Sequence, residues 1–253
     1  MKSKAFGVFL LITLLLTACG KLSDKDQSLT PEEYDEIGIP DPSKLWNHED
    51  YMETCEILDN LKTFKPYALP KKDSKRSGIY FSRIINPDNL SFLLDETTPL
   101  SERAYQIQKY IEIQRLLIFI YTNLGSNEQY YNRELIDLYI FSLTIAQSML
   151  DLGERINESI EEEDLKMQNR FHSIQNLYLS MVLFVLENQK KTSLFKEADL
   201  EKLTDFLYSS VSVNSGWIES DAAEDIKLRL QEIIDNTSSE HIKNKYSMLI
   251  EAL

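Results

Sequence analysis

Leu116-Leu117-Ile118-Phe119-Ile120-Tyr121 is the stretch that decides the fold of this chain. A continuous apolar run of this kind is compatible with a buried strand or with a buried helix. It lies within residues 100–124, which contain neither Gly nor Pro, whereas strands usually end after about 3–10 residues. The stretch therefore predicts a helix that ends near Asn123, just before Gly125.

Two further apolar runs have the same character. One lies within residues 135–152 and is expected to end as a helix at Gly153, and the other covers residues 177–186. Helices that are apolar on most faces are buried by neighbours on all sides, so these three helices should form the core. Asn-Gly and Asp-Gly pairs, which signal hairpins, are missing from the sequence. The fold class is therefore all-α.

The C-terminal part shows amphipathic spacing. Apolar residues recur at helical intervals over 226–234 and 242–250, and Ser220 and Ser238 are plausible caps for these two helices. No segment of the sequence recurs as a second matching copy at the periods of helical repeats. The pattern predicts an irregular helical bundle or a short helical stack, with residues 45–253 forming a single all-helical domain.

Ahead of this domain the chain is polar and broken by prolines. Residues 19–44 contain Pro31, Pro40 and Pro42, so this segment is expected to be an extended tether in which Thr30 could cap one short helical turn. Asn47 should cap the first helix of the domain, and Ser101 or Thr98 should cap the helix of the Leu116–Tyr121 run.

The N-terminus has the composition of an export signal. Lys2 and Lys4 precede a block of apolar residues that is too short to span a bilayer, and the segment ends in Leu16-Thr17-Ala18-Cys19. This ending resembles the lipobox of bacterial lipoproteins. The resemblance implies that residues 1–18 are a signal peptide and that Cys19 becomes the first residue and carries lipid, palmitate included. The mature chain would then be held at a bacterial membrane by acyl chains.

The resemblance also bears on localisation. In many Gram-negative lipoproteins an Asp after the lipidated Cys retains the protein in the inner membrane, and here that position is Gly20. A Gram-negative source would therefore place the chain in the outer membrane, on its periplasmic or surface face.

Charge and cysteine content narrow the possible partners. The sequence has 27 basic and 41 acidic residues, and removal of Lys2 and Lys4 with the signal leaves 25 − 41 = −16. Such an acidic chain is a poor candidate for nucleic acid, and its membrane link should be the lipid. With Cys19 lipidated, Cys55 has no partner for an intrachain disulfide and is expected to be a small buried hydrophobe.

Catalytic and metal signatures are missing from the sequence. The three histidines show no metal-ligand spacing, no phosphate-binding glycine loop occurs, and no cofactor is expected. An acidic run over residues 151–164 lacks the Gly-containing turn of a calcium site. We interpret that run as a solvated helix end or loop, or as a recognition surface.

The window Lys62–Arg83 differs from the rest of the chain because it has a net charge of +6 and is mostly loop. Two explanations remain open. The window could compensate the acidic run across the fold. Alternatively, four of its side chains could dock an anionic partner, namely lipid headgroups, a cell-wall polymer or an acidic protein face. These candidate partner-binding residues are Lys71, Lys72, Lys75 and Arg76.

Taken together, the sequence favours a lipid-anchored, non-catalytic binding protein of the bacterial envelope with a protein partner. It could be an accessory subunit of an envelope complex or an immunity-type inhibitor of a toxin. An alternative is a hydrolase of cell wall or lipid that uses a carboxylate pair assembled by the fold, which would require a cleft with a buried acid of raised pKa. A carrier of small molecules or lipids would require a large apolar cavity between the core helices.

Overall fold

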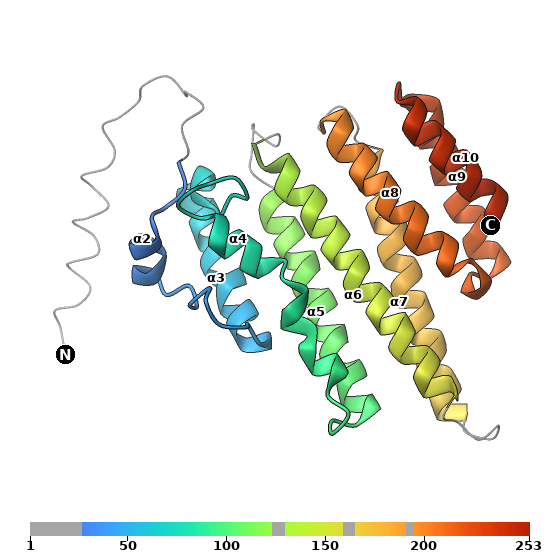
Figure 1. The fold of residues 1–253 in the computed structure, drawn as a ribbon, viewed down its shortest axis with the longest axis horizontal. Helices are drawn as coiled ribbons and strands as arrows, with labels where there is room; N and C mark the ends of the chain where they lie inside the picture. The colour runs from blue at the N-terminus through green and yellow to red at the C-terminus, as the bar shows by residue number, and fades with distance from the viewer. Residues whose placement is uncertain (1–26, 123–129, 159–164, 191–194) are drawn as a thin grey trace.

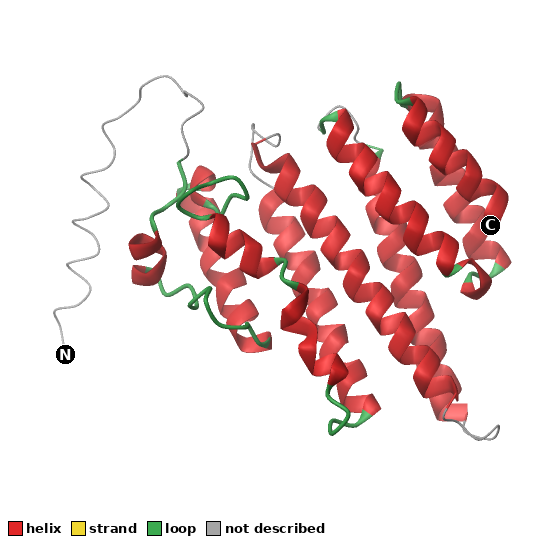
Figure 2. Cartoon of the chain, in the orientation of Figure 1, coloured by secondary structure: helices red, strands yellow, loops and turns green. Residues whose placement is uncertain are grey.

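The computed structural model describes residues 27–122, 130–158, 165–190 and 195–253, and these are all-helical with no strand. The predicted signal peptide, Cys19 and the first part of the predicted tether lie outside the described residues, as do Glu161 to Asp164 of the acidic run. The all-α prediction is confirmed (Figure 2).

The long helices alternate in direction and lie side by side in chain order (Figure 1). α3, α5, α7 and α9 occupy one layer, and α6, α8 and α10 occupy the other, because α5 packs on α3, α7 on α9, and α8 on both α6 and α10. The architecture is therefore a short helical stack, as predicted. The α-helices are α2 (Pro31–Glu36), α3 (His48–Phe64), α4 (Gly78–Ile84), α5 (Leu100–Thr122), α6 (Asn132–Glu158), α7 (Leu165–Gln189), α8 (Glu197–Val213), α9 (Ser220–Asn236) and α10 (Glu240–Ala252); the 3-10 helices are η1 (Pro66–Ala68), η2 (Pro87–Leu94) and η5 (Ser215–Trp217).

The three apolar helices form the centre of the stack, as the sequence predicts. α6 packs against α5, α7 and α8. Its segment Asn132–Arg155 is long and apolar enough to cross a membrane, but 72% of an 18-residue window within it is buried inside the protein, so α6 is a core helix. The predicted end at Gly153 is wrong, because α6 continues to Glu158. Gly153 is buried, and packing outweighs the roughly 1 kcal/mol by which Gly disfavours a helix.

The predicted tether ends earlier than expected. Thr30 does cap α2, through a capping box with Glu33. However, Leu29, Tyr34 and Ile39 are buried in the hydrophobic core. The boundary between tether and domain therefore lies before Ser28, and the residues after it belong to the folded domain.

Asn47 caps α3 as predicted, in a capping box with Asp50. The two C-terminal caps are displaced by one residue, since Glu219 precedes α9 and the Ser239 side chain caps α10. α5 begins at Leu100, so Ser101 lies within the helix, and the Thr98 hydroxyl donates to Asp95 instead. The cap at Asn47 was thus predicted exactly and the serine cap of α10 to within one residue, whereas the serine and threonine caps predicted for α9 and α5 are wrong.

Candidate functional site

The basic loop, residues 65–77, connects α3 to α4 and is held by buried tyrosines. Three successive carbonyls of this loop accept hydrogen bonds from tyrosine hydroxyls of three different elements. Ala68 O accepts from Tyr34 at 2.6 Å, Leu69 O from Tyr131 at 3.3 Å, and Pro70 O from Tyr121 at 2.8 Å. Buried backbone groups outside helices need such partners, so these tyrosines fix the course of the loop.

Lys72 ties the loop to the helical stack. Its backbone N–H donates to Glu134 Oε1 at 2.8 Å, and its Nζ lies 2.5 Å from Asp137 Oδ2. Asp137 is 5% exposed, and its second oxygen binds Lys202 of α8, also at 2.5 Å. Lys72 therefore binds the fold through Asp137, and its role in docking a partner together with its neighbours stays a prediction.

Of the other predicted partner-binding residues, two are exposed and one, Lys71, is half-buried. Lys75 and Arg76 are exposed and form no ion pair with any described residue, while the Lys71 ammonium lies 3.9 Å above the ring centroid of Tyr130. Ser74 Oγ accepts the backbone N–H groups of Arg76 and Ser77, which sets the turn that presents these cations. Lys65 at the start of the loop is also exposed. It lies within the predicted basic window but outside the predicted site.

The basic loop and the acidic run lie at opposite ends of α6. Glu134 and Asp137 contact the loop near the first turn of this helix, whereas Asp151 and Glu154 lie near its last turns. A rise of 1.5 Å per residue separates Asp137 from Glu154 by about 25 Å. The described part of the acidic run therefore does not compensate the basic loop; one loop cation, Lys72, pairs with Asp137 of α6 instead.

Glu134 has the property that the hydrolase alternative requires of one carboxylate. Burial raises the pKa of Glu134, although the Lys72 N–H hydrogen bond opposes this shift. Asp137 lies one helical turn further along α6. Nevertheless the observed partners of both carboxylates are loop and lysine groups, so this pair stabilises the loop against α6 and α8.

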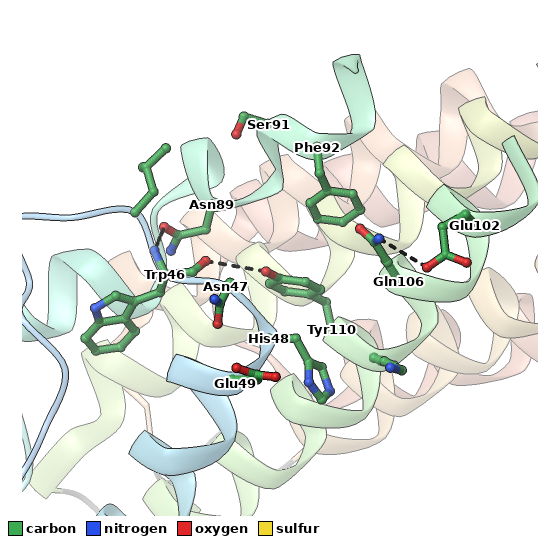
Figure 3. A pocket seen from close by; sticks show the side chains of 12 residues that line it. Trp46, Asn47, His48, Glu49, Asn89, Ser91, Phe92, Glu102, Gln106 and Tyr110 are labelled. Carbon is green, nitrogen blue, oxygen red and sulfur yellow. Dashed lines mark hydrogen bonds between the residues drawn. The ribbon is translucent and has the colours of Figure 1, made fainter. Parts of the chain in front are cut away.

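A groove of about 490 Å³ lies at the N-terminal end of the stack, between the start of α3, η2 and the first half of α5 (Figure 3). Phe92 and Tyr110 form its aromatic floor, with stacked rings whose centroids are 5.4 Å apart. The rim is polar and largely exposed. The lining residues are Leu45, Trp46, Asn47, His48, Glu49, Asn89, Ser91, Phe92, Glu102, Gln106, Lys109 and Tyr110.

Asn89 fixes the backbone around this groove. It is 4% exposed, its Oδ1 accepts the Trp46 N–H at 2.9 Å, and its Nδ2 donates to Tyr51 and to the Arg83 carbonyl. The Trp46 ring is buried and points away from Tyr110, whose hydroxyl donates to the Trp46 carbonyl (Figure 3). The floor is thus preformed by fully bonded groups.

The rim of the groove carries both acidic and basic side chains. Burial and, after it, the Lys109 charge lower the pKa of His48, so this imidazole is neutral at neutral pH. The Lys109 ammonium lies 4.5 Å above the Tyr105 ring, and Gln106 donates to Glu102 (Figure 3). An aromatic floor with a polar rim is suited to contact with a side chain of a partner.

The groove does not include α6 or α7, so it is not the apolar cavity expected of a carrier.

The sequence alone did not predict this groove. Its floor combines η2 with α5, and aromatic residues in those segments follow the same pattern as the core. The capping motif at Asn47 was the one signal that pointed to part of the rim.

Two further predictions concern metals and thiols. The described residues contain no group of three or more His, Cys, Asp or Glu side chains that could hold a metal ion. Cys55 is buried, as predicted, and burial raises the pKa of its thiol to about 12. A thiol of this kind is a core residue and a poor nucleophile.

Comparisons with family models, with curated proteins and with solved structures found no match for this chain.

Proposed function

We propose that this protein is a lipid-anchored, non-catalytic binding protein of the bacterial envelope, and that its groove receives a segment of a protein partner. The lipobox-like Leu16-Thr17-Ala18-Cys19 supports the anchor. The observation that carries the binding role is the groove itself, a solvent-open site with an aromatic floor and a polar rim. In protein interfaces, a few residues contribute most of the binding energy, and aromatic side chains in pockets with a polar rim are common among them.

The geometry of the groove supports a peptide segment better than a buried small ligand. Leu45, Glu49 and Ser91 on the rim are exposed, so the site is open on one side. Within its volume of about 490 Å³, Phe92 and Tyr110 would provide the apolar contact. The exposed acids Glu49 and Glu102 would favour a partner with basic groups beside its apolar anchor.

Lipidation is tested by metabolic labelling of the full-length chain with a palmitate analogue. The wild type should carry label and sediment with membranes, and Cys19→Ser should lose both. If Cys19→Ser and wild type fractionate alike and neither carries label, the anchor is disproved.

Partner binding is tested by photocrosslinking in cells. A photoreactive amino acid at Ser91, on the rim, should give one discrete adduct, because the group is held against the partner. The same amino acid at Val213, which is 74% exposed at the end of α8, is the matched control and should give none. If Ser91 and Leu45 both give no adduct in a chain that is lipidated, the groove is not a partner site.

The identity of the adduct separates the two versions of the proposal. A secreted or intercellular toxin domain would identify an immunity-type inhibitor, whereas a resident envelope protein would identify an accessory subunit. For the hydrolase alternative, Glu134→Gln should abolish any activity on cell wall or lipid; retention of the crosslinked partner in this variant would favour the binding role.

A further inference from the structure

Ser28, close to the first residue that the structure describes, lies beside the basic loop. Ser28 Oγ donates to Ser74 Oγ at 3.0 Å, so the point from which the tether departs is fixed against the loop. Only eight residues, Gly20 to Gln27, lie between Cys19 and Ser28 in the sequence. A chain of that length reaches at most about 30 Å, so a lipid on Cys19 would keep the loop close to the bilayer.

This loop carries charges that the fold leaves unpaired. Its single acid, Asp73, forms an ion pair with Arg133, and Asp137 binds Lys72. Within the described parts of the chain, the remaining cations of the loop form no ion pairs. These four cations are Lys65, Lys71, Lys75 and Arg76.

Nine acidic residues belong to the segments where α5 begins, α6 ends and α9 begins, and Figure 1 shows these helix ends at the edge of the stack opposite the loop. They lie several Debye lengths from the loop, since the Asp137–Glu154 separation along α6 alone is about 25 Å and the Debye length is about 8 Å at physiological ionic strength. Two acidic segments flank the loop: α2, which contacts it through the Tyr34–Ala68 hydrogen bond, and the start of α8, where Asp199 lies 3.9 Å from Arg133. Within the loop itself, five cations stand against the single acid Asp73, so the loop presents net positive charge to an anionic surface. The acids at the far edge are Asp95, Glu96, Glu102, Asp151, Glu154, Glu219, Asp221, Glu224 and Asp225.

We infer that the basic loop docks onto anionic lipid headgroups of the membrane that holds the anchor, and that the stack stands upright with its acidic edge away from the bilayer. This inference rests on the proposed lipid anchoring. The tether makes docking intramolecular, so a weak surface attraction suffices. Each Lys or Arg near an anionic membrane surface favours contact by about fivefold. The start of α3, and with it the groove, would then lie toward the outer end, accessible to a partner.

The test uses the full lipidated protein reconstituted into vesicles of phosphatidylcholine alone or with phosphatidylglycerol. Lysines are acetylated briefly, and the rate at each site is read by mass spectrometry. In the phosphatidylglycerol vesicles, acetylation of Lys65 and Lys75 should slow by about tenfold or more, and high salt should reverse this protection. Lys44 and Lys227, which lie away from the loop, should react at equal rates in both vesicles.

A pair of charge-matched variants tests the cause. Lys75→Ser with Arg76→Ser should return Lys65 to its rate in neutral vesicles, whereas Lys44→Ser with Arg155→Ser removes the same charge elsewhere and should leave Lys65 protected. Equal rates at Lys75 in the two vesicles, with the protein bound to both, would overturn the docking and leave the anchor intact. Protection that requires envelope extract and not phosphatidylglycerol would assign the loop to an acidic protein and also overturn it. Loss of binding to both vesicles would instead disprove the anchor.

Discussion

Lys72 of the basic loop and Asp137 of α6 are 65 residues apart in sequence, yet the lysine Nζ lies 2.5 Å from the aspartate Oδ2. Asp137 is nearly buried, and Lys202 of α8 occupies its other oxygen. One acid thus joins the loop, α6 and α8. Because this pair holds the loop in place, it determines where the unpaired cations of the loop project.

Asp137→Ala should lower the free energy of unfolding by about 2 kcal/mol, because two hydrogen-bonded ion pairs are lost and two lysines remain close together. The partial exposure of both lysines limits the effect. The measurement is urea unfolding of a chain that begins at Ser23. Asp205→Ala is the control, since Asp205 pairs with His241 and Lys245 but is 51% exposed, and it should change stability by less than about 0.5 kcal/mol. Equal losses in the two variants would contradict a structural role for Asp137.

Glu134→Gln should change how stability depends on pH. Burial raises the pKa of Glu134 above its ordinary 4.5, so the unfolded chain releases this proton at a lower pH than the folded chain does. The stability contributed by the protonated group is fully present below 4.5 and is lost as pH rises through the folded-state pKa.

The neutral Gln can still accept the Lys72 N–H bond at every pH. Wild type should therefore be less stable than Glu134→Gln at neutral pH, and should approach the variant as pH falls toward 4.5. Urea midpoints of both chains across this range measure the difference directly. A difference that does not vary with pH would show that the pKa of Glu134 is not raised.

Much of the fold was predictable because the apolar runs are long. Residues 116–121 lie in a segment without Gly or Pro, and only a helix fits that length. Burial of Cys55 and the cap at Asn47 followed from local pattern in the same way. The helix end predicted at Gly153 was wrong, because packing around α6, and not the local sequence, decides where that helix ends.

The candidate sites were less accessible from sequence. The basic window was visible as a charge pattern, but its pattern does not distinguish Lys72, which is bound by Asp137, from Lys75, which is unpaired. Ion pairs between distant residues depend on the tertiary fold. The groove could not be predicted from the sequence for a related reason. Phe92 and Tyr110 lie on one face only after η2 packs against α5.

Cys55 should be almost unreactive in the folded protein. A pKa of about 12 leaves very little thiolate at neutral pH, and burial restricts access. Its reaction with a disulfide reagent should be at least about a hundredfold slower than that of a cysteine placed on the groove rim by Ser91→Cys, and should become fast in urea. Comparable rates for the two thiols in the native protein would contradict the burial of Cys55.

Asn89→Ala should be among the most destabilising polar substitutions in the chain. It removes three hydrogen bonds at once and leaves the Trp46 N–H, the Tyr51 hydroxyl and the Arg83 carbonyl without this partner. Unsatisfied buried groups of this kind cost about 1–3 kcal/mol each, so the expected loss is about 3 kcal/mol after partial relaxation. Asn60→Ala on the exposed face of α3 is the control and should be nearly neutral.

The same substitution tests whether the groove depends on a preformed floor. Trp46 and Tyr110 are linked to Asn89 through backbone and ring contacts, so its loss should loosen the groove before the whole stack unfolds. At a temperature where Asn89→Ala is still folded by circular dichroism, crosslinking from Ser91 should fall severalfold, whereas vesicle binding through the lipid should not change. Undiminished crosslinking in a folded Asn89→Ala protein would show that the partner does not use the groove as the structure presents it.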